Sequence, residues 1–123
     1  MDFIKIGALL GAVAVILGAF GAHALKSQLS PEQLTTYQTG ILYHFIHVFA
    51  ILVVGLLIGE ANNQKLLYAG WFFILGILFF SGSLYLLSCK AILGIESWRF
   101  LGPITPIGGI FFIVGWILLA FGR

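Results

Sequence analysis

Charged side chains are scarce in this sequence. Only 8% of its 123 residues are charged, whereas roughly 25% are charged in an average soluble domain. Hydrophobic residues make up 61% of the chain, which is more apolar surface than a soluble core of this size can bury. The composition therefore excludes an ordinary soluble domain.

Other absences exclude further classes of protein. The chain has a single cysteine, Cys89, and so cannot form an internal disulfide. Its formal net charge of +2 is dispersed along the chain, which leaves no basic patch for a nucleic-acid partner. The alternating apolar and polar pattern of outer-membrane strands is also missing. A helical membrane protein is the class that remains.

The few charged residues leave four long uncharged runs, at 6–25, 33–59, 66–89 and 100–122. A helix needs roughly 20 residues to cross the hydrocarbon core of a bilayer, and every run reaches that length. The sequence therefore predicts an all-α integral membrane protein, a single domain over 1–123 with four transmembrane helices in a compact antiparallel bundle. The spans are expected at about 4–25, 37–59, 66–88 and 102–121.

The first run has two interpretations. Lys5, an apolar stretch and then Ala22-His23-Ala24 resemble a secretory signal with its small-residue cleavage site. We interpret the run as the first membrane helix. Its small residues are spaced alternately four and three apart, which places them on one helical face, and in lipid such a face lets a second helix approach closely. The predicted packing face consists of Gly7, Gly11, Ala14, Gly18 and Gly21.

Two segments predict how later helices begin. Ser30-Pro31-Glu32-Gln33 has a capping serine, a proline at the first helical position and a glutamine at the third. A capped helix start is therefore expected at 30–36, continuing into the second span with a possible bend at Gly40. The polar turn from Glu60 to Lys65 is short, so the second and third spans are expected to form a hairpin.

The fourth span begins with Gly102-Pro103-Ile104-Thr105-Pro106. Either Pro103 opens the helix and Pro106 costs one internal hydrogen bond, or Thr105 caps a helix that begins at Pro106. Within this span, the residues at 111–115 (FFIVG) resemble those at 72–76 (FFILG) in the third span. Composition alone or an internal repeat could produce that likeness.

Polar residues gather on one side of the second span. Tyr37, His44 and His47 fall within about a third of its circumference at 100° per residue, and the opposite side is apolar. An imidazole that faces hydrocarbon leaves both nitrogens without partners. The polar side is therefore expected to face other helices or a watery cleft.

Three roles for the histidines remain open. They can form hydrogen bonds with Ser81, Tyr85 or a carbonyl of a neighbouring helix and so fix the packing. His44 and His47 can handle protons or ions in an oligomeric transporter. They can also bind a metal or haem, with His23 as a third ligand. Ser81 and its neighbouring serines lack an evident oxyanion arrangement, so no enzyme is expected.

Four segments together resemble a known family. They are GAFGAHAL at 18–25, YQTGILYHFIH at 37–47, LFFSGSLYLL at 78–87 and GPITPIGGIFFIVGW at 102–116. In this order they are similar to the small inner-membrane proteins of domain-of-unknown-function family 423 and to related eukaryotic four-span proteins. The resemblance implies a compact four-helix membrane protein but supplies no function. It marks as signature positions Gly18, Gly21, His23, Tyr37, Gln38, His47, Ser81, Gly82, Tyr85, Pro103, Pro106 and Gly108.

The resulting hypothesis is a structural or ligand-binding membrane protein with one intramembrane polar cluster. Its candidate members are His23, Tyr37, Gln38, His44, His47, Ser81, Tyr85 and Thr105. A cleft between the start of the second helix and the proline-rich start of the fourth is expected to hold the head group of a membrane lipid or a small hydrophobic ligand. No metal or cofactor is assigned, and self-association is expected. Three basic residues lie at each end of the bundle, and the free α-amino group adds a little positive charge to the end that holds the termini. Both termini are therefore expected on the cytoplasmic side of the inner membrane.

Overall fold

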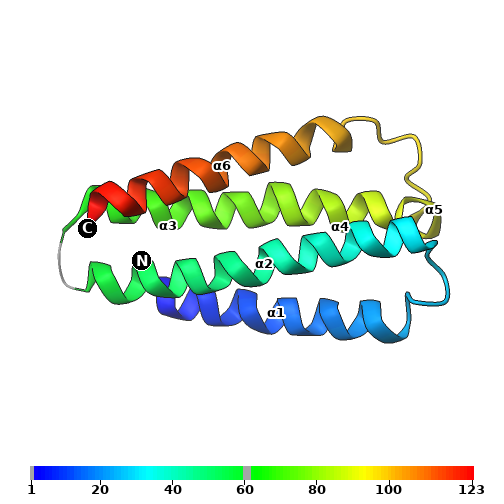
Figure 1. The fold of residues 1–123 in the computed structure, drawn as a ribbon, viewed down its shortest axis with the longest axis horizontal. Helices are drawn as coiled ribbons and strands as arrows, with labels where there is room; N and C mark the ends of the chain where they lie inside the picture. Colours follow the sequence, from blue (N-terminus) through cyan, green and yellow to red (C-terminus); the bar gives the residue numbers. More distant parts are fainter. Residues whose placement is uncertain (1, 60–61) are drawn as a thin grey trace.

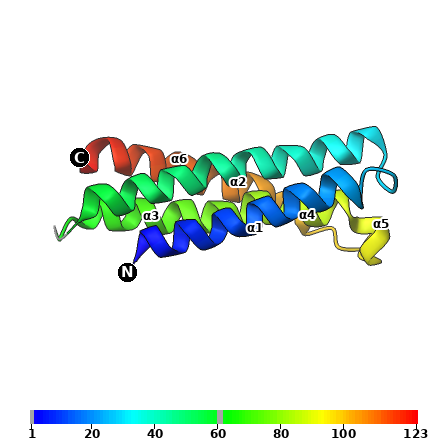
Figure 2. The ribbon, with the colours of Figure 1, turned by 90° about the horizontal axis from the view of Figure 1, so that it is seen from below.

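The computed structural model describes residues 2–59 and 62–123, in which every regular element is a helix. The helices are α1 (Phe3–His23), α2 (Pro31–Ile58), α3 (Gln64–Gly76), the π-helical turn η1 (Ile77–Ser81), α4 (Gly82–Ser88), α5 (Lys90–Leu93) and α6 (Leu101–Gly122). The spans run side by side, and the start of α1 and the end of α6 lie at the same end of the bundle as the end of α2 and the start of α3 (Figures 1 and 2). The predicted all-α class is confirmed.

Four stretches of helix are long and apolar enough to cross a membrane: α1, α2, α6 and the continuous stretch Gln64–Ser88. The connections from α1 to α2 and from α4 through α5 to α6 lie together at the end opposite the termini (Figure 1). Successive spans are therefore antiparallel.

The start of α2 is the capped one that the sequence predicts. Ser30 Oγ accepts a hydrogen bond from the Gln33 amide at 3.1 Å, and Gln33 Oε1 accepts one from the Ser30 amide at 2.9 Å. From Pro31 the helix runs unbroken through Gly40. Gly40 instead makes room for a neighbour, because a Cβ there would lie 2.8 Å from Cε1 of Tyr85.

Both prolines lie inside α6, which begins at Leu101. The alternative in which Thr105 caps a helix that begins at Pro106 is therefore wrong. Pro103 costs no hydrogen bond, because amides of the first turn have no intrahelical acceptor. Pro106 leaves only the carbonyl of Gly102 without its donor, and Gly102 is exposed.

The predicted packing face of α1 is confirmed, and α2 is its partner. A Cβ at Gly7 would lie 2.8 Å from Cδ2 of Leu52, and one at Gly11 would lie 3.3 Å from Cγ1 of Val48. Nearer the other end of α1, Gly21 lies directly against the ring of Tyr37. The small residues therefore let α1 and α2 pack closely over most of their length.

The two similar phenylalanine–glycine segments pack against each other. The ring of Phe112 fills the space beside Gly76, and the ring of Phe73 fills the space beside Gly115. Each segment thus contributes one phenylalanine ring and one glycine, and each glycine makes room for the ring of the other segment. The likeness between 72–76 and 111–115 therefore corresponds to a reciprocal antiparallel contact between α3 and α6, and Phe73 and Phe112 belong to the main hydrophobic core.

The third span contains the π-helical turn η1, which the sequence pattern did not reveal. Such turns insert one extra residue into an α-helix and frequently occur at functional sites. Here Ser81 Oγ donates a hydrogen bond to the Gly40 carbonyl at 2.8 Å on one side of the turn. On the other side, Gly108 of α6 lies against the backbone of Phe79 and Phe80. The turn is therefore held between α2 and α6.

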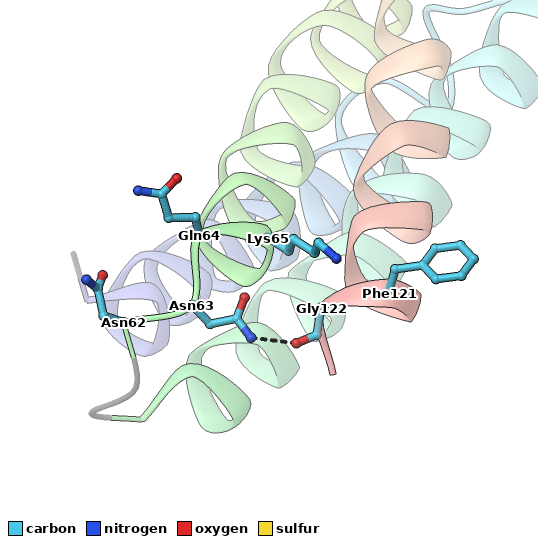
Figure 3. Close-up of a pocket in the computed structure, with 6 residues that line it drawn as sticks. All are labelled: Asn62, Asn63, Gln64, Lys65, Phe121 and Gly122. Atoms are coloured by element: carbon cyan, nitrogen blue, oxygen red, sulfur yellow. Dashed lines mark hydrogen bonds between the residues drawn. The ribbon is translucent and has the colours of Figure 1, made fainter.

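Asn63 joins α3 to the end of α6. Its Oδ1 accepts a hydrogen bond from the Leu66 amide at 3.2 Å, and its Nδ2 donates one to the Gly122 carbonyl at 2.6 Å (Figure 3). One side chain thus pairs with the start of one helix and the end of its antiparallel neighbour. The polar turn was predicted from Glu60 onward, and Glu60 and Ala61 lie outside the described residues.

We predict that Gly108→Ala lowers the free energy of unfolding by about 1–3 kcal/mol. The added Cβ would meet the backbone of η1, which cannot rotate away as a side chain can. Steric trapping or denaturant titration in detergent would measure the change. Gly102→Ala is the matched control on the same helix, because no atom lies within 4 Å of its Cβ position. Equal stability of the two variants would contradict this account of the packing.

Candidate functional site

His44 connects three segments of the bundle. Its Nδ1 lies 2.7 Å from the hydroxyl of Tyr85 on α4, and its Nε2 lies 2.9 Å from the carbonyl of Leu10 on α1. A carbonyl can only accept, so Nε2 carries the proton and Nδ1 accepts from Tyr85. His44 is therefore a neutral imidazole with both nitrogens paired, and it is only 2% exposed.

His47, one turn further along α2, pairs with α6. The indole Nε1–H of Trp116 donates to His47 Nε2 at 3.0 Å, so the proton lies on Nδ1, which donates to the Tyr43 carbonyl at 2.7 Å. The imidazole stacks on Phe112 with ring centroids 3.5 Å apart. His44 and His47 thus adopt opposite tautomers, each selected by its partners.

Other hydrogen bonds connect further pairs of helices. Tyr37 donates through its hydroxyl to the Leu17 carbonyl at 2.6 Å, which joins α2 to α1. The hydroxyls of Ser83 and Thr105 lie 2.5 Å apart and join α4 to α6. Together with the bonds of His44, His47 and Ser81, these contacts form what we call the histidine network. Within the described residues, no buried side-chain nitrogen or oxygen lacks a partner.

Of the residues expected in one polar cluster, Tyr37, His44, His47, Ser81 and Tyr85 are buried or partly buried between helices. Tyr85 contacts two of the others, because its hydroxyl bonds to His44 and its ring lies 5.3 Å from that of Tyr37. Thr105 pairs with Ser83 rather than with either histidine.

His23 and Gln38 do not join the network. Both are exposed. His23 lies thirteen residues along α1 from Leu10, or about 20 Å at the helical rise, so it does not meet the paired histidines. Across residues 2–59 and 62–123, no group of three His, Cys, Asp or Glu side chains is placed to hold a metal ion.

Trp116 and Ser83 belong to the network but were not among the members predicted from the sequence. Trp116 lies within the fourth uncharged run, whereas tryptophans of membrane proteins usually gather at the interfaces. An indole N–H inside the hydrocarbon needs an acceptor. The unprotonated nitrogen of His47 supplies one, and that pairing could have been anticipated from the sequence.

An apolar pocket of about 300 Å³ lies at the end of the bundle away from the termini. We call it the terminal pocket. It is bounded by Leu17 and Phe20 of α1, Tyr37 of α2, Tyr85 of α4 and Ile92 of α5. The cleft expected from the sequence, between the start of the second helix and the proline-rich start of the fourth, is a different place, because α6 contributes no residue to the terminal pocket.

Loss of one hydroxyl tests the network. We predict that Tyr85→Phe lowers the free energy of unfolding by about 0.6–2 kcal/mol, because His44 Nδ1 loses its donor. Tyr68→Phe removes the same hydroxyl from an exposed site and serves as the control. Heteronuclear NMR should also find the proton of His44 on Nε2 in the unaltered protein. A proton on Nδ1 would contradict the assigned direction of the bond.

Comparison with known proteins gives the family. The family model described as "Protein of unknown function (DUF423)" matches residues 17–109. A UPF0382 membrane protein of Staphylococcus saprophyticus is 42% identical over 120 residues, which cover 98% of this chain and 94% of that protein. The UPF0382 membrane protein YwdK of Bacillus subtilis is 41% identical over 118 residues, which cover 95% and 91%. No solved structure matches.

These relatives confirm the resemblance drawn from the four sequence segments. They are named as membrane proteins, in agreement with the four helices that are long enough to cross a bilayer. The chain is therefore an integral membrane protein that belongs to the DUF423 family.

Proposed function

We propose that this protein binds a membrane lipid in its terminal pocket, and that the histidine network holds the helices around that pocket. The observation that carries the proposal is the chemistry of the pocket wall. Tyr37 and Tyr85 line it, but their hydroxyls are already bonded to the Leu17 carbonyl and to His44. The wall is therefore largely apolar and suits an occupant without polar groups, such as an acyl chain.

The position of the pocket supports a lipid. It lies at the end of the bundle, beside the connections that follow α1 and α4. Lys26 follows the lining residue Leu25, and Lys90 follows the lining residue Cys89. Two cations next to an apolar pocket at the level of the membrane surface suit a phospholipid whose chain enters the pocket and whose phosphate stays outside.

The histidine network favours a structural role for His44 and His47 over proton conduction. The proton on each imidazole points to a backbone carbonyl, that of Leu10 or Tyr43. A carbonyl cannot pass a proton onward, and no bond joins the two histidines within the described chain. The serines are bound in the same way, since Ser81 and Ser83 donate to carbonyls. We therefore propose neither a proton pathway nor an enzymatic site.

Native mass spectrometry after gentle release from detergent tests the lipid proposal. We predict an adduct with the mass of one phospholipid, which is lost in Ala24→Phe because the new ring occupies the terminal pocket. Ala19→Phe places the same ring on an exposed position of α1 outside this pocket and should keep the adduct. An unaltered adduct in Ala24→Phe, or no adduct in the native protein, would refute the proposal.

The same spectrum reports the subunit count, and we expect more than one copy of the chain.

We also propose that both termini face the cytoplasm of the cell that carries the protein in its plasma membrane. The structure places the termini at one end of the bundle (Figure 1), so one measurement orients the whole chain. Reporter fusions at the C-terminus should be active when the reporter is a cytoplasmic fluorescent protein and inactive when it is a periplasmic or extracellular phosphatase. The reverse pattern would invert the orientation.

A further inference from the structure

A second hollow lies between α2 and α6, away from the terminal pocket. It has a volume of about 490 Å³. Leu42, Tyr43 and Ile46 of α2 form one wall, and Gly109, Ile113 and Trp116 of α6 form the other. His47, Phe80 and Phe112 complete the lining. We call this hollow the α2–α6 groove.

Aromatic rings dominate the lining of the groove. Tyr43 and Phe80 have ring centroids 4.6 Å apart, and His47 stacks on Phe112 at an angle of 11° between the ring planes. Phe80 and Phe112 lie 5.5 Å apart. A planar ring can form offset or edge contacts with such a surface that a flexible acyl chain cannot.

One residue that lines the groove has a polar group without a partner. Both nitrogens of His47 and the indole nitrogen of Trp116 are hydrogen-bonded. The hydroxyl of Tyr43 has no hydrogen-bond partner within residues 2–59 and 62–123, and Tyr43 is 38% exposed. An unpaired hydroxyl in hydrocarbon is unfavourable, so an occupant that supplies an acceptor oxygen would be held.

The position of Tyr43 narrows the chemistry of that occupant. Eleven residues separate it from Glu32, the nearest charged residue on α2, which is about 16 Å along the helix. The methylene groups of a lipid chain offer no oxygen there. We propose that the α2–α6 groove binds an apolar molecule with a planar ring that carries a carbonyl oxygen, as in a quinone, and that Tyr43 donates a hydrogen bond to that oxygen.

A pair of probes with the same carbon skeleton, one with carbonyl oxygens and one without, tests the hydrogen bond. Equilibrium dialysis of the detergent-solubilised protein would measure the affinity for 2-methyl-1,4-naphthoquinone and for 2-methylnaphthalene. We expect Tyr43→Phe to weaken quinone binding about three- to tenfold, the effect of one neutral hydrogen bond, and to leave naphthalene binding unchanged. Tyr68→Phe removes an exposed hydroxyl from α3 and should change neither. Equal loss for both probes, or no loss for the quinone, would overturn the assigned role of Tyr43.

A second pair of variants tests the location. Gly109 lines the groove, and a Cβ there would make only ordinary contact with Phe80, at 3.8 Å. Gly109→Leu should therefore fold, fill the groove and abolish binding of both probes, while Gly102→Leu on the same helix should bind both normally. Unchanged quinone binding in Gly109→Leu would overturn the site.

Two further outcomes distinguish quinone binding in the groove from binding in the terminal pocket and from occupation of the groove by a second copy of the chain. Ala24→Phe, which blocks the terminal pocket, should leave quinone binding intact, so this site and the proposed lipid site can fail independently. If a second copy of the chain fills the groove instead, the quinone will not bind and Gly109→Leu will reduce the subunit count in native mass spectra. That result would also refute the proposal.

Discussion

The arrangement of the bundle depends on the need to pair every polar group of two histidines inside hydrocarbon. An imidazole has one donor and one acceptor nitrogen, and lipid offers a partner to neither. His44 obtains its partners from α1 and α4, and His47 obtains one from α6. Because both residues lie on α2, one turn apart, α2 is hydrogen-bonded through them to each of the other three membrane-spanning stretches, and it is joined to Gln64–Ser88 through Tyr85. Ser81 extends the same pattern to η1.

Close packing brings the helices near enough for those bonds to form. In lipid the hydrophobic effect does not drive helices together, so contact depends on shape. Glycines on α1 accept the side chains of α2, and the reciprocal pairs Phe73 with Gly115 and Phe112 with Gly76 join α3 to α6. Phe112 also stacks on His47. The same ring thus serves both the packing of α6 and the placement of the imidazole.

The histidine network also decides which surfaces remain free to bind. It uses the polar atoms of Tyr37, Tyr85, His44 and His47, so the terminal pocket presents a largely apolar wall. In the α2–α6 groove, the hydroxyl of Tyr43 is the group that the network leaves unused. The two hollows therefore differ in chemistry, although tyrosine rings line both. Their proposed occupants, a lipid chain and a ring that carries an oxygen, follow from that difference.

The sequence by itself determined the class of fold, the number of spans, the capped start of α2 and the glycine face of α1, because these depend on charge placement and on spacing along one helix. It also indicated that the histidines face inward, since hydrocarbon cannot satisfy an imidazole. Only the tertiary structure decided which backbone carbonyls take part: those of Leu10 and Tyr43 accept from the histidines and that of Gly40 accepts from Ser81. A backbone carbonyl carries no residue-specific signal in the sequence. The π-helical turn, the pairing of Thr105 with Ser83 and the exclusion of His23 were likewise decided by packing between helices, because the register between two helices is not encoded in the periodicity of either one.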